Sequence, residues 1–68
     1  MKAAVVTVGD EILIGQVIDT NSAFICEELN KIGIQVVRII SVSDKKDEIW
    51  NGLDISKKEA DIILMTGG

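Results

Sequence analysis

Three runs of branched apolar residues, separated by two segments with helical periodicity, constrain the fold of this chain more than any other feature. The runs cover residues 3–8, 34–43 and 61–66. Strands that are apolar along their whole length favour a parallel sheet with helices on both faces. The connections are long enough for right-handed crossovers. We therefore predict an α/β fold in the order β-α-β-α-β, with three layers and a mainly parallel sheet.

The first helical segment is expected over residues 21–32. Three good N-cap residues precede or begin it, and Gly33 follows it at the position that favours a left-handed residue. Its apolar stripe would comprise Ile25, Leu29 and Ile32.

The second helix is expected over residues 45–59, with Ser43 or Asp44 as its N-cap and Trp50 packed beside its apolar stripe. Residues 10–19 fit a short helical turn, a bent extension or a strand-like loop, and the pattern does not choose among them.

Composition narrows the function classes. The 68-residue chain has a net charge of -4, which argues against a nucleic-acid surface. Cys26 is the single cysteine and histidine is absent, so an internal disulfide is impossible and a zinc site would lack its commonest ligands. The first residues are typical of a strand and not of a secretion signal, and no apolar run is long enough to span a bilayer. We expect a cytoplasmic protein without a membrane partner.

Chemistry is expected at the carboxyl ends of the strands, where open α/β sheets gather their ligands. Gly9, Asp10 and Glu11 follow the first strand, and the third strand ends in Thr66, Gly67 and Gly68. The amino end of the first helix, with Asp19, Thr20 and Asn21, should open toward the same side and offer N–H groups to a phosphate. Gly15 is a candidate hinge in the first loop.

Each of these groups has a second interpretation. Asp10 and Glu11 suit Mg²⁺ binding or general-base work, and they equally suit a solvated turn. The two C-terminal glycines suit close approach to a ligand or a plain tight turn, and residues 19–21 suit a helix cap. A P-loop and a Gly-x-Gly-x-x-Gly turn are both missing, so P-loop and Rossmann nucleotide sites are unsupported.

The combined motifs resemble the molybdopterin-binding (MoCF) domain family, and within it the CinA-like, competence/damage-inducible branch. The resemblance rests on Val-Gly-Asp-Glu-Ile-Leu-Ile-Gly-Gln-Val-Ile-Asp-Thr-Asn, on Leu-Asn-Lys-Ile-Gly-Ile, on Val-Ser-Asp and on the final Ile-Leu-Met-Thr-Gly-Gly. It implies a larger three-layer α/β domain, of which residues 1–68 are the front part. Relatives of this kind bind and adenylylate molybdopterin in molybdenum cofactor biosynthesis, or hydrolyse nucleotide pyrophosphates such as ADP-ribose with a divalent metal.

The resemblance carries over residue by residue. The matching positions are candidate pocket residues: Gly9, Asp10, Glu11, Asp19, Thr20, Asn21, Thr66, Gly67 and Gly68. From the residues themselves we expect Asp10 and Glu11 to be catalytic and to bind the metal, and Gly15 to belong to the ligand-binding set. In the family the two glycines lead into Gly-x-Gly-Pro-Thr and an acidic residue, so this polypeptide alone is expected to be inactive. Its two open sheet edges should pair with further residues of the domain or with another chain, as in a homo-oligomer. A non-catalytic assembly or ligand-binding module is the alternative.

Overall fold

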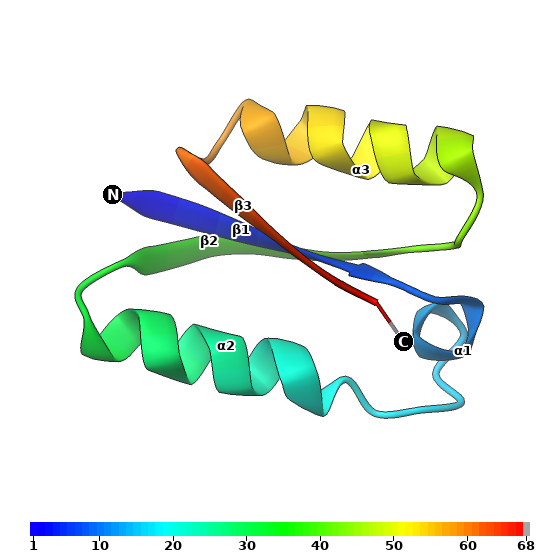
Figure 1. Ribbon diagram of the computed structural model, residues 1–68, viewed down its shortest axis with the longest axis horizontal. Helices are drawn as coiled ribbons and strands as arrows, with labels where there is room; N and C mark the ends of the chain where they lie inside the picture. Colours follow the sequence, from blue (N-terminus) through cyan, green and yellow to red (C-terminus); the bar gives the residue numbers. More distant parts are fainter. Residues whose placement is uncertain (68) are drawn as a thin grey trace.

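The computed structural model describes residues 1–67, and these form an α/β unit in the predicted order (Figure 1). Its elements, in chain order, are β1 (Lys2–Val8), α1 (Asp10–Leu13), α2 (Thr20–Lys31), β2 (Gln35–Val42), α3 (Lys46–Lys57) and β3 (Ile62–Gly67). The three predicted strands and the two long helices are confirmed, each within a few residues of its expected bounds.

The described strands make a parallel sheet in the order β2-β1-β3. Helix α2 covers one face and α3 covers the other, so the predicted three layers are confirmed (Figure 1). The chain moves from β1 to one neighbour and then crosses to the other. The strand order therefore reverses between β1 and β3, the position at which ligands bind in folds of this class. Among residues 1–67, no helix has the length and apolar character required to cross a membrane.

The core is built on the central strand. Ala3, Val5, Val6 and Thr7 of β1 have no exposed surface. This agrees with the prediction that the first apolar run is covered on both faces. The outer strands are only partly covered, because each has a neighbouring strand on one side alone within the described chain.

Both ends of α2 follow the sequence signals. The Asp19 carboxylate accepts a hydrogen bond from the Ser22 N–H at 3.0 Å, which makes Asp19 the N-cap. Gly33 has a φ of 82° and donates to Asn30, while Ile34 donates to Leu29. These paired bonds form a Schellman motif, so the predicted helix stop at Gly33 is confirmed.

Three expectations about the helices are wrong. Trp50 was expected to pack, yet its side chain is 62% exposed on the outer surface of α3. Ile32 is 71% exposed, because it is the C-cap of α2 and lies beyond the stripe that faces the sheet. Lys45, and neither Ser43 nor Asp44, is the N-cap of α3, and it makes no side-chain cap bond with a described residue.

The undecided segment, residues 10–19, contains one helical turn and then an irregular loop. The carbonyl of Glu11 accepts hydrogen bonds from the N–H groups of both Gln16 and Val17, at 2.8 and 3.1 Å. These bonds fold the loop back on α1 before the chain enters α2. The apolar residues on either side of Gly15 therefore belong to a compact turn.

Candidate functional site

The carboxyl ends of β1 and β3 lie side by side. Val8 pairs with Gly67 in the parallel register, and Thr7 pairs with Thr66. The loop that begins with Gly9 therefore starts beside the last described residues of β3. The structure thus brings the acidic dipeptide and the end of β3 to the same edge of the sheet (Figure 1). Gly68, a predicted ligand-binding residue, lies outside the described residues.

Gly9 makes the sharp exit from β1. Its φ of 154° is a conformation that residues with a Cβ rarely adopt, and its N–H donates to the carbonyl of Val42 at 3.0 Å. The Glu11 carboxylate folds back against it, so that a Cβ at Gly9 would stand 2.7 Å from Glu11 Oε1. The sequence predicted a turn or a pocket residue at Gly9; the structure also shows that the missing side chain makes room for a carboxylate.

The two adjacent carboxylates therefore differ in their surroundings. Glu11 is half-buried against the strand end, whereas Asp10 is exposed at the start of α1. Among residues 1–67, no group of three or more acidic, cysteine or histidine side chains is close enough to hold a metal ion. A cation bound by Asp10 and Glu11 would need further oxygen ligands from a phosphate or from water.

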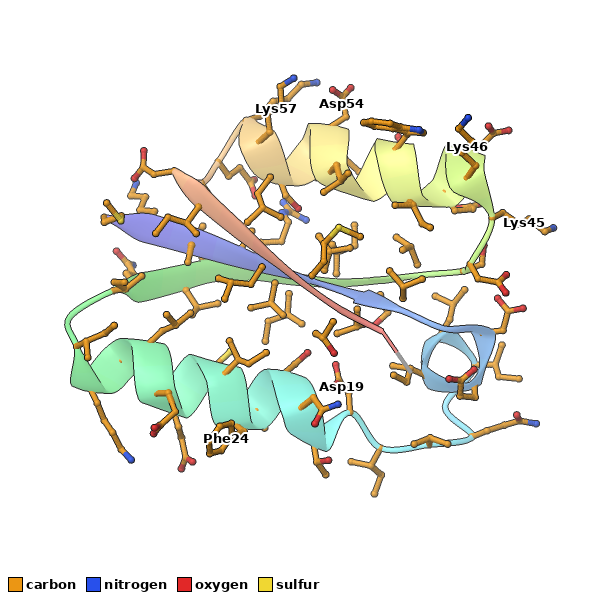
Figure 2. The ribbon with its side chains drawn as sticks, in the orientation of Figure 1. Asp19, Phe24, Lys45, Lys46, Asp54 and Lys57 are labelled. Atoms are coloured by element: carbon orange, nitrogen blue, oxygen red, sulfur yellow. The ribbon has the colours of Figure 1, made fainter. Side chains whose placement is uncertain are left out.

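The start of α2 carries a negative cap. Asp19 is half-buried and bonded to the Ser22 N–H, while Thr20 and Asn21 are exposed in the first turn. Figure 2 shows Asp19 on the sheet side of this helix end. The Asp19 carboxylate already accepts the hydrogen bond of one N–H group at this helix end. It would also repel an approaching phosphate, because both groups are negatively charged. The expected phosphate seat at α2 is thus partly occupied by the protein's own anion.

Gly15 lies in the turn after α1, with a φ of 79° and its N–H bonded to the Ile12 carbonyl at 3.2 Å. This fits the hinge interpretation of Gly15. It is exposed, and a Cβ at this position would meet no described atom within 4 Å.

The sequence analysis missed a row of hydroxyl groups beneath the strand ends. Thr7 Oγ1 donates to Ser41 Oγ at 2.7 Å across the β1–β2 pair, and Thr66 stands beside Thr7 on the other side. Paired residues of parallel strands face the same side of the sheet, which places the three hydroxyl groups on one face. Polar residues at the end of apolar strands were the available signal, but only the strand register aligns them.

The carboxyl ends of the strands therefore carry the half-buried carboxylate of Glu11, the exposed carboxylate of Asp10 and the unusual backbone of Gly9. The row of hydroxyl groups lies next to them. Carboxylates and hydroxyls are ligands for hard cations and for phosphate-bound metal ions. This arrangement suits a metal-bound anion better than a bare one.

Comparison with known proteins gives a consistent result. Residues 4–68 match the family model described as "Probable molybdopterin binding domain". The chain is 53% identical to a CinA-like protein of Flavobacterium psychrophilum and 50% identical to one of Chloroherpeton thalassium, in both cases over all of its own length and 16% of theirs. A crystal structure of the protein CinA, of unknown function, from Thermoplasma acidophilum superposes with a TM-score of 0.90 at 39% identity. That match covers 94% of this chain and 38% of the other.

Proposed function

The chain belongs to the family of probable molybdopterin-binding domains, and from this premise we propose that it binds a phosphate-containing pterin or nucleotide at the carboxyl ends of β1 and β3. The chain spans about one sixth of the length of its curated CinA-like relatives, so the activity of a whole protein of this kind is part of the proposal. Molybdopterin and ADP-ribose are the two ligand types that we consider. Both carry phosphate beside a flat heterocycle.

One observation carries the proposal: the register that pairs Val8 with Gly67. It puts Gly9, Glu11 and the end of β3 around one point of the sheet edge, at the place where the strand order reverses. Glycine backbone allows close approach of a ligand there, since no Cβ intervenes.

The electrostatics favour a divalent cation as part of the bound species. The nearby Asp10, Glu11 and Asp19 are acidic, and the whole chain is negative, so a free phosphate would meet repulsion. A Mg²⁺ ion would reduce that repulsion, and the residues that would hold it are Asp10 and Glu11. When bound, it would polarise a phosphate oxygen and favour attack by water.

Within this scheme the residues of the chain have separate roles. Glu11, whose carboxylate lies against Gly9, suits a metal ligand or a base for water. Asp10 is exposed and suits direct contact with the cation. We propose that the complete domain hydrolyses a pyrophosphate such as ADP-ribose. We also propose a cytoplasmic location, since the single cysteine gives no sign of an oxidising compartment.

The test is thermal unfolding of the 68-residue chain with ADP-ribose, with and without MgCl₂. A ligand present at 100 times its Kd should stabilise the fold by about 2.7 kcal/mol, and this effect should require the metal. The double variant Asp10→Asn, Glu11→Gln should lose most of it. The variant Asp54→Asn, on the outer side of α3, removes one carboxylate far from the site and serves as control (Figure 2).

An unchanged unfolding temperature with ADP-ribose and with molybdopterin would refute ligand binding. A shift that survives in the double variant would refute the assignment of Asp10 and Glu11. AMP release from ADP-ribose, followed by chromatography with the complete domain, tests hydrolysis apart from binding.

A non-catalytic assembly module is the second candidate. It is favoured by the large apolar side chains that are exposed on the surface: Met1, Leu13, Ile14, Val17, Ile18, Phe24, Ile32, Ile39, Trp50 and Met65. Such a module would give no ligand-dependent shift with either compound, and the same experiment therefore separates the two functions.

A further inference from the structure

The start of α2 carries a buried hydroxyl group to which the chain gives no partner. Ser22, in the first turn, is 3% exposed and is the one residue of α2 that is buried. Its Oγ has no hydrogen-bond partner among residues 1–67. A buried hydroxyl without a partner costs stability, and few such groups remain in folded proteins. We therefore looked for a bound group that could supply the partner.

The sheet face beneath this helix end is also polar. Val6 and Val42 face α3, because a Cβ at Gly52 of that helix would meet both valines. Their neighbours Thr7 and Ser41 point to the opposite face, since side chains alternate along a strand. Helix α2 covers that face and begins at the carboxyl ends of the strands (Figure 1). The start of α2 and the row of hydroxyl groups therefore lie on the same face and at the same end of the sheet.

The N-cap of α2 adds a carboxylate oxygen that remains available. Asp19 Oδ1 accepts a hydrogen bond from the Ser22 N–H at 3.0 Å, and no described residue bonds to Oδ2. The side chain is half-buried and lies on the sheet side of the helix end (Figure 2). An ionised carboxylate accepts hydrogen bonds and donates none. This corner of the molecule therefore suits an O–H or N–H group better than a phosphate.

We propose that the start of α2 binds a hydrogen-bond donor of the ligand, a ribose hydroxyl or an N–H group of a pterin, through Asp19 Oδ2 and Ser22 Oγ. This inference rests on the proposed function. It assigns the donor groups of the ligand to the α2 face of the sheet, whereas the phosphates stay with the metal ion at Asp10 and Glu11. The start of α2 then selects the ligand by its neutral part.

Binding to Ser22 requires a small outward movement of the helix start, because Oγ is closed to solvent in the chain by itself. The preceding loop allows this movement. The N–H groups of residues 13–17 donate to carbonyl groups of residues 9–12, so this loop is held by its own backbone. A shift of the start of α2 breaks none of these bonds.

Thermal unfolding of the 68-residue chain in MgCl₂ tests the inference with two probes, ADP-ribose and inorganic pyrophosphate, which has no ribose. Asp19→Asn keeps an oxygen for the Ser22 N–H and turns the second oxygen into an NH₂ donor. It should weaken ADP-ribose binding by about tenfold or more in Kd. Pyrophosphate should bind as tightly as before or more tightly, since a negative charge is lost.

Ser22→Ala removes the hydroxyl that has no partner. Without ligand, the unfolding temperature should stay the same or rise, while ADP-ribose binding should weaken and pyrophosphate binding should not. Ser56→Ala is the matched control. Ser56 is also fully buried with an Oγ that has no partner in the described chain, but it lies on α3, against the other face of the sheet. This variant should bind both probes as the parent does.

Tighter binding of ADP-ribose to Asp19→Asn would show that the start of α2 holds a phosphate, and it would overturn the inference. Equal effects of Ser22→Ala and Ser56→Ala on ADP-ribose would do the same. A pyrophosphate shift that ADP-ribose does not exceed overturns this inference alone, whereas no shift with either probe also overturns the proposed function.

Pterin, which has N–H groups and no ribose, separates the two donors. A pterin shift that Asp19→Asn removes assigns the N–H groups, and the absence of such a shift assigns the ribose hydroxyl.

Discussion

The Glu11 carboxylate lies against Gly9: a Cβ at Gly9 would stand 2.7 Å from Glu11 Oε1, so the carboxylate would have to shift. Gly9 also has a φ of 154°. The sharp exit from β1 and the position of the carboxylate are therefore two consequences of one glycine. This contact links the stability of the loop to the proposed site.

Gly9→Ala should destabilise the fold by about 1–3 kcal/mol for the strained backbone, with a further loss from the displaced carboxylate. Gly33→Ala is the control for strain alone, because Gly33 has a φ of 82° and a Cβ there would meet no described atom within 4 Å. Urea unfolding measures both. If the two variants lose the same stability, the contact with Glu11 has no energetic role; if the contact matters, Glu11→Ala should restore part of the loss in Gly9→Ala.

Asp19→Ala should lower the free energy of unfolding by about 1 kcal/mol, since it removes the acceptor of the Ser22 N–H at the start of α2. For a domain of this size, that corresponds to a fall of roughly 4–8 °C in Tm. Asp19→Asn keeps an oxygen acceptor and should retain most of the stability. A loss of equal size in both variants would mean that the charge on Asp19, and not its capping bond, stabilises the helix.

Gly52→Ala should destabilise the protein although alanine is the better helix former. Gly52 is buried on the sheet side of α3, and a Cβ there would stand 2.9 Å from Val42 Cγ1. Overpacking costs about 1–3 kcal/mol, against a propensity gain of about 1 kcal/mol. In a Val42→Ala background the clash is absent, so Gly52→Ala should become stabilising. Urea unfolding of the parent, the two single variants and the double variant gives the coupling free energy between the two substitutions. Additive effects would contradict the close contact between Gly52 and Val42.

The Arg38–Glu59 pair should make stability depend on pH. The hydrogen bond from Arg38, with its positive charge, lowers the pKa of the Glu59 carboxyl in the folded chain. The pair therefore stabilises the fold above the ordinary pKa of a carboxyl, and this contribution is lost as the pH falls through the lowered value.

Glu59→Gln should accordingly reduce the urea midpoint slightly at neutral pH and leave it unchanged at acid pH, where Glu59 of the parent is also neutral. Both side chains are partly exposed, so the effect is small and added salt should reduce it further. Asp54→Asn is the control, since Asp54 is exposed and forms no ion pair with a described residue. A deficit in Glu59→Gln that persists in acid would show that the carboxyl acts through packing and not through its charge.

The two ends of α2 could be predicted from the sequence because each depends on residues close together in the chain. Asp19 caps α2 through the N–H of a residue three positions away, and Gly33 ends it through its own backbone conformation. Trp50 shows the limit of such reasoning. It was expected to pack beside the apolar stripe of α3, but Gly52 and Ser56 occupy the buried face and Trp50 is exposed.

The candidate site, too, was predicted only in part from the sequence. The sequence identified Gly9, Asp10, Glu11, Thr66 and Gly67 as residues at strand ends, because strands and their terminating glycines have local signatures. It did not distinguish Glu11 from Asp10, and it missed the bond from Thr7 to Ser41. The bond from Thr7 to Ser41 depends on the register between segments 34 residues apart, and the position of the Glu11 carboxylate depends on the backbone turn at Gly9.

The amino-acid sequence by itself determined the order of strands and helices, the two ends of α2, the acidic character and the family, because these follow from residue periodicity, backbone preference and motif order. Only the tertiary structure decided which strand lies in the centre, which carboxylate is half-buried and which hydroxyl groups lie side by side at the strand ends. Those properties arise when β1 pairs with β2 on one side and β3 on the other, since the pairing fixes which distant residues share an edge.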